Sequence, residues 1–469
     1  MLKYISTRGQ APRIGFADAT LTGLASDGGL YVPEFCPKIE PGEMGNMANQ
    51  NYLEIAWRVM LPFVSEDLSS EDLIRLIKAS YKAFDTKEVA PLKKLEDNLQ
   101  VLELFHGPTL AFKDVALQFL GNIFSHFLNL RERKVTIIGA TSGDTGSAAI
   151  EAFRGKPNVN IFIFHPHKRV SEVQRRQMTT VTDKNVFNVA IEGSFDDCQD
   201  LVKAMFNDAT FRAEMQLSAI NSINWARILA QVVYYIYAGA KIHDQTGKKV
   251  TFCVPTGNFG NVYAGYVAQS MGLPVDKLIV ATNRNDILHR FFETGRMKME
   301  GVTPSLSPSM DIQVSSNFER LLFDLFGRMP KAVAQTMEHF RKSGPYHLED
   351  DVMIGLRQLF ASGRMDDAQT TEVIKRTYDK YGYIVDPHTA VGLGVAREYQ
   401  KAHPDSVIVS LATAHPAKFP EAVKRAIGIE PPLPVHLADL YTRSEKYDIL
   451  PNNLVKAQAF VRNGVRAVS

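Results

Sequence analysis

Hydrophobic residues in the middle of the chain occur in short runs that alternate with longer stretches of helix-like spacing. The short runs are rich in valine and isoleucine and predict strands at 135–139, 159–164, 186–191, 251–254, 278–282 and 407–412. The stretches between them predict helices that cover 170–178 and 195–206, and others that end near 153 and 271. Because buried parallel strands are continuously apolar and alternate with helices, this pattern predicts an α/β fold with parallel sheets and helices on both faces.

The regions on either side of this core have a different pattern. Residues 52–61, 71–84 and 350–382 have helical spacing. Residues 299–317 hold two prolines and five serines, which predicts a loop that crosses between elements. With 469 residues the chain is too long for one compact core, so we expect two or three domains.

The composition disfavours nucleic-acid-binding, membrane, disulfide-linked and metal-binding proteins. The chain has 53 Lys and Arg and 51 Asp and Glu residues, and a net charge of +2 gives no electrostatic basis for binding nucleic acid or a membrane surface. The three cysteines lie far apart and the histidines lack metal-ligand spacing, so we expect no disulfide, no metal and a reducing compartment. The amino terminus has no apolar signal core, and the best apolar run, 228–240, is too short to span a bilayer. We therefore expect a cytoplasmic protein.

One lysine stands in an unusual place. The segment 103–114 (ELFHGPTLAFKD) is mostly apolar, contains glycine and proline, and holds Lys113. Burial disfavours the charged amine and lowers its pKa from about 10.4, and a neutral amine can hold an aldehyde cofactor as a Schiff base. The alternative is a lysine at a strand-to-helix corner, with its stem buried and its amine in water. This segment alone does not separate the two interpretations.

A glycine-containing loop, 256–261 (TGNFGN), lies directly between a predicted strand and a predicted helix. Its glycines allow a tight turn, and the unpaired N–H groups at the start of the helix favour a bound anion by about 0.3–2 kcal/mol. The loop is neither a Walker motif nor the GxGxxG dinucleotide fingerprint. It predicts a phosphate-binding loop, and the alternative is a strand-helix turn without a ligand.

A second strand-to-helix loop, 140–146 (ATSGDTG), adds hydroxyl side chains to its backbone N–H groups. This combination suits a carboxylate or a polar substituent of a ring. Ser142, Asp144 or Thr145 could instead cap the helix that follows, and one loop can serve both purposes.

The segment 221–227 (NSINWAR) opens the long apolar helix. We expect Asn221 or Ser222 to cap this helix, with Asn224 and Arg227 on one face. An arginine in the first turn opposes the helix dipole, so a bound anion explains Arg227 better than a surface position does.

The last candidate segment is 411–419 (LATAHPAKF), at the carboxyl end of a predicted strand, where open parallel sheets bind ligands. A hydroxyl at Thr413 could hydrogen-bond a heterocyclic nitrogen. We interpret His415 as structural, because no carboxylate is spaced to orient it.

Taken together, these segments resemble the threonine synthase family, which are pyridoxal-phosphate enzymes of the tryptophan-synthase β-like fold (fold type II). The resemblance covers nearly the whole chain and is closest to the bacterial and fungal branch. It is specific, because GPTLAFKD and TAHPAKF occur in one chain in this order. The motifs are LASDGGLYVP at 24–33, GPTLAFKD at 107–114, ATSGDTG at 140–146, NSIN at 221–224, PTGNFGN at 255–261, LSPSMDI at 306–312, SNFER at 316–320, DPHTA at 386–390 and TAHPAKF at 413–419.

The resemblance implies a role for each candidate residue. Lys113 would carry pyridoxal 5'-phosphate as a Schiff base, and Thr413 would meet the pyridine nitrogen without holding it protonated. The cofactor phosphate would bind to Gly257, Asn258, Phe259, Gly260 and Asn261. The substrate carboxylate and the cofactor ring would face Thr141, Ser142, Asp144 and Thr145, and the substrate phosphate would contact Ser222, Asn224 and Arg227.

The resemblance also implies a reaction and an architecture. The reaction is the last step of threonine biosynthesis, a lyase reaction in which O-phospho-L-homoserine and water become L-threonine and phosphate by γ-elimination and β-addition of water. The architecture is two open, mostly parallel sheets with flanking helices and an amino-terminal segment, in a monomer or a homodimer. The expected divisions are 1–90 for that segment, 91–130 with 210–430 for the large cofactor domain, 131–209 for the small domain and 431–469 for a carboxyl-terminal tail.

Three other functions compete with this one. A serine or threonine dehydratase of the same fold would not need a second anion site, so Arg227 would be idle in it. A catalytically silent relative is disfavoured because Lys113 and both loops are intact. A nucleotide-binding regulatory protein is disfavoured because its phosphate-binding motifs are missing.

Overall fold

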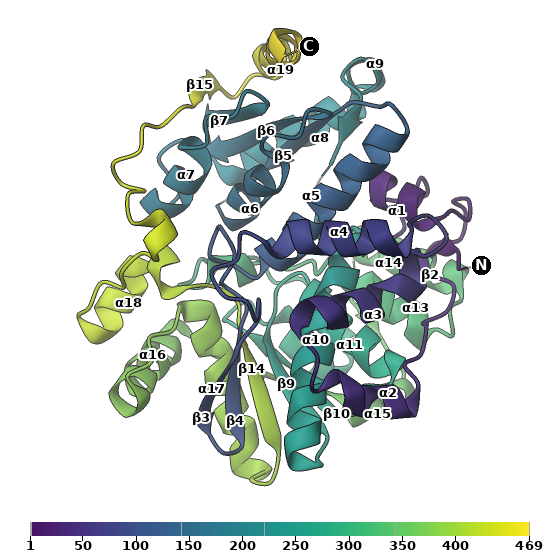
Figure 1. Ribbon diagram of the computed structural model, residues 1–469, viewed down its shortest axis with the longest axis vertical. Helices are drawn as coiled ribbons and strands as arrows, with labels where there is room; N and C mark the ends of the chain where they lie inside the picture. The colour runs from purple at the N-terminus through teal and green to yellow at the C-terminus, as the bar shows by residue number, and fades with distance from the viewer. Residues whose placement is uncertain (1, 142, 220, 343, 469) are drawn as a thin grey trace.

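Two mostly parallel sheets organise the chain in this computed structural model, which describes residues 2–141, 143–219, 221–342 and 344–468. The larger sheet has six strands in the order β13-β10-β9-β14-β4-β3, and the smaller sheet has five in the order β15-β7-β6-β5-β8. Adjacent strands in them run parallel except for the antiparallel pair β3–β4. Figure 1 shows the smaller sheet above the larger one. The predicted α/β fold with two open sheets is confirmed.

The strands have the following bounds: β1 Tyr4–Ser6, β2 Tyr31–Pro33, β3 Leu92–Glu96, β4 Leu99–Glu103, β5 Val135–Ala140, β6 Val159–Pro166, β7 Val186–Glu192, β8 Leu217–Ser218, β9 Val250–Pro255, β10 Val275–Thr282, β11 Arg296–Met297, β12 Tyr346–His347, β13 Phe360–Arg364, β14 Val407–Ala412 and β15 Asp448–Pro451.

The helices have the following bounds: α1 Phe16–Thr22, α2 Pro41–Met47, α3 Tyr52–Val64, α4 Ser70–Tyr81, α5 Lys113–Leu130, α6 Asp144–Phe153, α7 Glu172–Thr179, α8 Phe195–Asn207, α9 Ala209–Glu214, α10 Trp225–Thr246, α11 Gly260–Met271, α12 Ile287–Thr294, α13 Phe318–Leu325, α14 Pro330–Lys342, α15 Asp350–Leu359, α16 Asp367–Tyr381, α17 Pro387–Ala402, α18 Pro420–Ile427 and α19 Leu454–Val468. Short 3-10 helices lie at Pro308–Met310, Pro416–Lys418 and Val435–Leu437.

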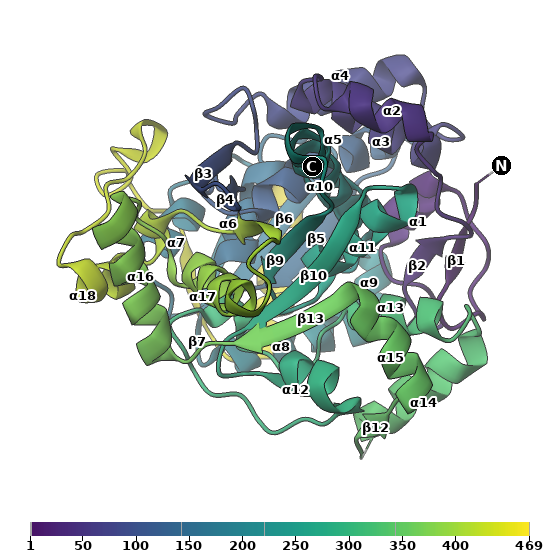
Figure 2. The same cartoon turned by 90° about the horizontal axis from the view of Figure 1, so that it is seen from below.

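The central strands of each sheet are buried on both faces, which explains their continuous apolar runs. In β9, Phe252 belongs to the core that includes α10, whereas its neighbour Cys253 belongs to the core under α17. In β5, Ile137 and Ile138 divide in the same way between the α5–α6 side and the α8 side. Successive side chains of a strand point to opposite faces, so both must be apolar when helices cover both faces. Figure 2 shows α17 and α11 on opposite sides of the larger sheet.

The amino-terminal helices α1–α4 pack beside α5 and α10 (Figure 1). The helix α10 is at the centre of this layer, and most of its side chains are buried, from Trp225 to Ala240. It ends at Thr246 and is followed by Gly247, which has a φ of 66° and therefore the left-handed conformation that favours glycine after a helix. Within the described residues, no helix is both long and apolar enough to cross a membrane.

Two predictions of secondary structure are wrong. Residues 350–382 do not form continuous helix, because β13 separates α15 from α16 and pairs with β10, Leu278 opposite Phe360. The sequence of β13, FASGR, has no apolar alternation, so its strand conformation depends on the partner strand. The long apolar helix begins at Trp225 and is capped by Asn224, whose side chain accepts a hydrogen bond from the backbone N–H of Ala226, and not by Asn221 or Ser222.

The smaller sheet draws on distant parts of the chain. β8 lies beside β5 at one edge, and β15, from the segment 431–469, pairs with β7 at the other edge. The final helix α19 packs on α8 (Figure 1). The segment expected as a tail thus contributes an edge strand and a covering helix, while the division into domains stays a prediction.

Candidate active site

Lys113 is brought to the end of β14 by pairing between two loops. The backbone N–H of Phe112 donates to the carbonyl of Thr413 at 2.9 Å, and the N–H of His415 donates to the carbonyl of Leu110 at 3.0 Å. Leu110 has a φ of 64°, an unusual conformation for a residue with a side chain, and it turns the backbone just before Lys113. Lys113 is the first residue of α5, and its side chain is 12% exposed.

Asp114 anchors the same turn from inside the protein. Its carboxylate accepts hydrogen bonds from the backbone N–H of Thr109 at 2.8 Å and from the Thr109 hydroxyl at 2.6 Å. Burial raises the pKa of Asp114 to about 6, against the effect of these bonds. A side chain at Gly107 would collide with Asp114, which explains the glycine of the GPTLAFKD motif. This arrangement orients the start of α5 and with it Lys113.

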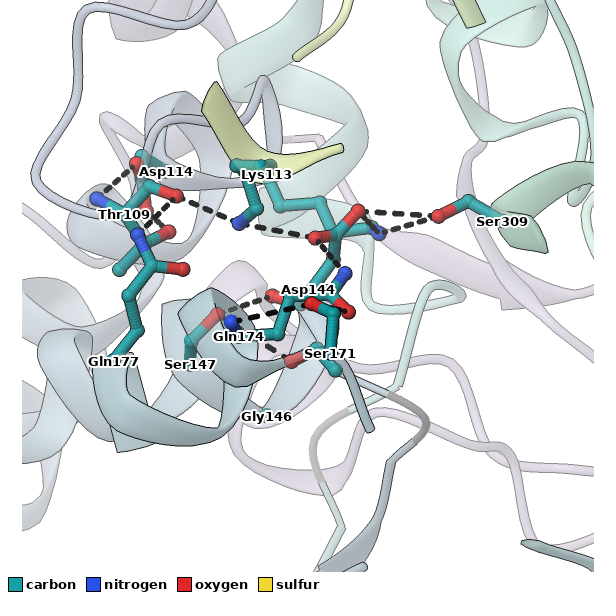
Figure 3. Close-up of polar contacts among 12 residues, drawn as sticks. Thr109, Lys113, Asp114, Asp144, Gly146, Ser147, Ser171, Gln174, Gln177 and Ser309 are labelled. Atoms are coloured by element: carbon teal, nitrogen blue, oxygen red, sulfur yellow. Dashed lines mark hydrogen bonds and ion pairs between the residues drawn. The ribbon is translucent and has the colours of Figure 1, made fainter. Parts of the chain in front are cut away.

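The amine of Lys113 lies in a buried cluster of opposite charges (Figure 3). Its Nζ is 3.3 Å from Oδ2 of Asp144, and the Nζ of Lys418, which is fully buried, is 3.0 Å from Oδ1 of the same carboxylate. The hydroxyl of Ser309 donates to Oδ2 at 3.1 Å, and the side-chain amide of Gln174 donates to Oδ1 at 2.8 Å. Residues from four distant segments therefore converge on Asp144.

The cluster changes the ionisation of its members. Burial lowers the pKa of Lys113 below its ordinary value, and the charges of Lys418 and Arg227 lower it further, although Asp144 opposes the change. Burial by itself would raise the pKa of Asp144, but Lys113 and Lys418 hold that pKa well below its usual range. The site thus combines an ionised carboxylate with an amine that releases its proton more easily than a free lysine does.

Sequence reasoning did not assign roles to Lys418, Ser309 or Gln174. Lys418 and Ser309 stand in the TAHPAKF and LSPSMDI segments, so a signal for them was present. A lysine in a short apolar segment after a strand was the same signal that singled out Lys113. Gln174 carried no comparable signal, because a glutamine in a polar helix is typical of a surface.

The backbone of the loop 256–261 allows a ligand to come close to its N–H groups. Phe259 has a φ of 62°, precedes the first residue of α11, and has a ring that is 1% exposed and packs edge-on against Phe318. A side chain at Gly257 would lie 2.7 Å from the carbonyl oxygen of Ser309. Because the Phe259 ring is buried in the core, the loop is held rigidly where α11 begins.

The other members of this loop are held by side chains nearby. The carbonyl of Asn258 accepts hydrogen bonds from the backbone and the side chain of Asn317, at 3.0 and 3.1 Å. Gly260 is the first residue of α11, and the first turn of this helix contains no acidic residue. Asn261 follows, and its side-chain nitrogen is buried without a hydrogen-bond partner in the part of the chain that the structure describes. The free N–H groups of such a helix start suit a phosphate.

Thr413 follows β14 directly and is 6% exposed. Among the described residues, its hydroxyl has no hydrogen-bond partner, whereas its carbonyl holds Phe112. The hydroxyl is thus available to a ligand next to Lys113. His415, expected to be structural, accepts a hydrogen bond from the N–H of Ala417, and burial lowers its pKa to about 4.

Neither Asp144 nor Thr145 in the loop 140–146 caps the helix that follows, so for these two residues the capping alternative is wrong. The residue before α6 is Gly143, and Asp144 and Thr145 lie inside the helix, so neither caps it. The hydroxyl of Thr141 accepts hydrogen bonds from the N–H groups of Gly143 and Gly146, at 3.0 and 2.9 Å. Thr145 is half-buried, and Ser142 lies outside the described residues.

Arg227 is a buried cation without an acidic partner among the described residues. It is 3% exposed, its Nη1 donates to the carbonyl of Asn221 at 2.8 Å, and its Nε has no hydrogen-bond partner in residues 2–141, 143–219, 221–342 and 344–468. Burial lowers the pKa of Arg227 to about 10. A buried, unpaired guanidinium is energetically costly, and a bound anion would remove much of that cost. Arg227 is therefore a candidate anion-binding residue.

The two polar neighbours of Arg227 are already bonded within the protein. The side chain of Asn224 caps α10 with its oxygen and donates to the carbonyl of Thr20 at 2.8 Å with its nitrogen. The hydroxyl of Ser222 lies 3.0 Å from that of Ser316. Their contact with a substrate stays a prediction.

Comparisons with known proteins agree along the whole chain. The family model for the threonine synthase N terminus matches residues 3–81, the model for pyridoxal-phosphate dependent enzymes matches 88–340, and the model for the threonine synthase C-terminal region matches 389–461. The threonine synthase of Pseudomonas aeruginosa is 55% identical over 461 residues, 98% of this chain and 98% of that protein. That of Saccharomyces cerevisiae is 42% identical and covers 97% of this chain and 92% of its own length.

Solved structures give the same result. The crystal structure of PLP-bound threonine synthase from Brucella melitensis has a TM-score of 0.96 and 49% sequence identity, and the match covers 99% of this chain and all of that one. The threonine synthase structure from Escherichia coli has a TM-score of 0.81 and 31% identity, over 98% and 99% of the two chains. The chain therefore belongs to the threonine synthase family of pyridoxal-phosphate dependent enzymes.

Proposed function

We propose that this chain converts O-phospho-L-homoserine and water to L-threonine and phosphate, with pyridoxal 5'-phosphate as its cofactor. Family membership over the full length supports the reaction. The observation that carries it in this chain is Arg227, a buried guanidinium whose Nε has no partner among the described residues and whose charge lowers the pKa of Lys113. A substrate phosphate would supply the missing negative charge, which a dehydratase substrate does not have.

The residues present fit the cofactor. Lys113 offers a buried amine with a lowered pKa, the helix start at Gly260 offers N–H groups without a competing carboxylate, and Thr413 offers an unused hydroxyl. When bound, pyridoxal phosphate withdraws electrons from the substrate carbons next to the amino group. A threonine at the ring nitrogen, unlike an aspartate, does not hold that nitrogen protonated, so Thr413 would moderate the withdrawal.

Lys113 would move the protons that the reaction requires. The pKa of Lys113 is lower than that of a free lysine. Its amine is therefore more often neutral and able to take a proton from carbon, and once charged it releases that proton more easily. Asp144, which stays ionised, would hold the amine in place whenever it becomes charged. Gly257, Asn258, Phe259, Gly260 and Asn261 would hold the cofactor phosphate, and the loop with Thr141, Ser142, Asp144 and Thr145 would face the substrate carboxylate.

We further infer that the small domain, 131–209, closes on the large one to exclude water during elimination. The contacts of Asp144 with Lys418 and Ser309 support this. Asp144 belongs to the expected small domain, whereas Lys418 and Ser309 belong to the expected large one. We also infer a cytoplasmic monomer or homodimer that binds no nucleic acid. The free cysteines Cys36, Cys198 and Cys253 and the net charge of +2 support that setting.

The direct test is to incubate the purified chain with O-phosphohomoserine and measure phosphate and threonine. Both products should form in equal amounts. Phosphate without threonine, or no turnover of the phosphorylated substrate by cofactor-loaded protein, would overturn the proposal.

The variant Arg227→Ala separates this function from that of a dehydratase. We expect kcat/KM for phosphohomoserine to fall about ten- to a hundredfold, because a charge-assisted contact is lost. Slow elimination from serine should change much less, because it involves Arg227 only through the small effect of its charge on Lys113, and the cofactor content should stay unchanged. The exposed Arg284 has no such environment, so Arg284→Ala is the control. An equal loss with both substrates would make Arg227 structural.

A further inference from the structure

Two neighbouring tyrosines of α10 converge on one atom of the phosphate loop. The hydroxyl of Tyr234 donates to Oδ1 of Asn261 at 2.5 Å, and the hydroxyl of Tyr235 donates to the same oxygen at 2.9 Å. Both tyrosine side chains are fully buried, and Asn261 is 6% exposed. α10 and α11 lie side by side, so these bonds connect the two helices (Figure 1).

The two hydroxyls determine which way the asparagine amide points. Burial raises the pKa of both Tyr234 and Tyr235 well above 10, so both phenols keep a proton to donate. An amide has an oxygen that accepts and a nitrogen that only donates. If the amide of Asn261 were reversed, two buried hydroxyl protons would lose their acceptor. The oxygen therefore faces α10, and the nitrogen is directed away from the tyrosines.

The nitrogen of this amide has no hydrogen-bond partner within the described structure. Nδ2 of Asn261 is buried and makes no hydrogen bond with the described residues. Buried polar atoms without partners are rare, because they lose their hydrogen bonds to water without replacement. Asn261 follows Gly260 at the start of α11, where backbone N–H groups are also unpaired and no acidic side chain competes for them.

The same helix face carries the second candidate anion site. Arg227 and Tyr234 are seven residues apart on α10, which places them on one side of the helix, two turns apart. The side chain of Tyr234 also influences the pKa of Arg227, as expected for neighbours in a buried site. α10 therefore supports the surroundings of Arg227 and the amide of Asn261 from one rigid element.

We propose that Tyr234 and Tyr235 are positioning residues, which orient the Asn261 amide so that its nitrogen donates a hydrogen bond to the cofactor phosphate. The inference rests on the proposed cofactor. It adds a pair of residues, outside the glycine loop, whose hydroxyls set the affinity for pyridoxal phosphate without touching it. Because either tyrosine alone can hold the amide oxygen, their contributions are expected to be redundant.

The test compares five variants of the full-length chain: Tyr234→Phe, Tyr235→Phe, the double variant, Asn261→Asp and Tyr237→Phe. Tyr237 is the matched control, since it lies on the same helix and its hydroxyl donates to Glu88 at 3.4 Å. The dissociation constant of pyridoxal phosphate is measured by fluorescence titration of cofactor-depleted protein. The environment of the cofactor phosphorus is measured by phosphorus NMR of the loaded protein.

We expect each single tyrosine variant to weaken cofactor binding no more than about threefold, and the double variant to weaken it by about tenfold or more. The double variant should also shift the phosphorus resonance. Asn261→Asp keeps two acceptor oxygens for the tyrosines but loses the donor and adds a negative charge beside the phosphate, so it should weaken binding by about ten- to a hundredfold. Tyr237→Phe should match the wild type in both measurements.

The alternative is that the tyrosines only join α10 to α11. In that case the tyrosine hydroxyls would not affect the affinity for the cofactor, and unchanged cofactor binding by Asn261→Asp would overturn the proposal. A double variant with unchanged affinity and resonance would overturn it too. If the double variant does not fold, as judged by its thermal unfolding, Asn261→Asp and the single variants decide. A wild-type chain that binds no pyridoxal phosphate would count against the proposed cofactor itself.

Discussion

The helices α6 and α11 begin in the same way along the sequence and differently in space. Both follow a buried parallel strand and a glycine-containing loop. α6 begins with Asp144, a carboxylate that is already paired with Lys113 and Lys418. The first turn of α11 has no acid, and the side-chain nitrogen of Asn261 has no hydrogen-bond partner among the residues described.

The difference shows how one local motif can serve two purposes. A helix start favours negative charge wherever that charge comes from. In α6 the protein supplies the negative charge itself and uses it to bind two lysines. In α11 the charge is missing, so the same backbone geometry is available to a phosphate. The side chains of the first turn, and what they contact, therefore decide whether such a loop binds a ligand.

Removing the internal anion should have the largest effect. Asp144→Asn leaves two buried lysines without their counter-charge, and we expect it to lower the free energy of unfolding by about 3–5 kcal/mol. Loss of the acid should also lower the pKa of Lys113 further, since Asp144 raises it. Chemical denaturation measures the first effect, and the pH dependence of cofactor attachment at Lys113 measures the second.

The control for that variant is Glu421→Gln, which alters an exposed acid in the first turn of α18. It should change stability by no more than about 1 kcal/mol. Equal effects of the two substitutions would mean that the helix start, and not the buried cluster, accounts for the stabilisation by Asp144.

Filling the open loop should have the next largest effect. In Gly257→Ala the new methyl group would lie 2.7 Å from the backbone oxygen of Ser309, which cannot move away as a flexible side chain does. We expect a loss of about 1–3 kcal/mol in stability and weaker cofactor binding. Gly355→Ala, in α15 with open space around it, should instead stabilise the protein by about 0.4–1 kcal/mol. Normal stability and cofactor content in Gly257→Ala would show that there is more space between Gly257 and Ser309 than this distance indicates.

Substitutions of Thr141 test how much the loop 140–146 depends on hydrogen bonds made by its own side chains. Thr141→Val has nearly the same shape but leaves the N–H groups of Gly143 and Gly146 without an acceptor, at a cost of about 1–3 kcal/mol. Thr141→Ser should retain most of the stability. Thr145→Val, at a half-buried position, is the control and should change stability by less than about 0.5 kcal/mol. Similar losses in the two valine variants would contradict the internal role of Thr141.

The smallest effect is a change in the acid dependence of stability. The pKa of Asp144 is lower in the folded protein than its ordinary value near 3.8, so its contribution is complete above that value. It is lost as the pH falls from there towards the lowered pKa. Over this range the unfolding free energy of the wild type should fall more steeply than that of Asp144→Asn, by at most about 1.4 kcal/mol per pH unit. Denaturation curves between pH 2 and pH 5 measure both slopes, and parallel slopes would mean that Asp144 is not ionised in the cluster.

Much of the architecture could be predicted, because its signals are local. The strand run 407–412 matches β14, and the runs at 135–139 and 159–164 lie within β5 and β6. Buried parallel strands need apolar residues on both faces, so they are readable without their partners. β13 and β15 were missed for the converse reason, since each is a strand at a sheet edge that depends on one neighbour.

The sequence by itself determined the central alternation of strands and helices from β5 to β10, the strand β14, the two loops and the unusual lysine, because each depends on residues close together in the chain. Only the tertiary structure decided which groups surround that lysine. Asp144, Lys418 and Ser309 come from segments far apart in sequence, and their contacts form only when the ends of several strands meet. The ionisation of Lys113 and Asp144 was decided there as well, since a pKa responds to burial and to charges a few ångströms away, and no local pattern contains either.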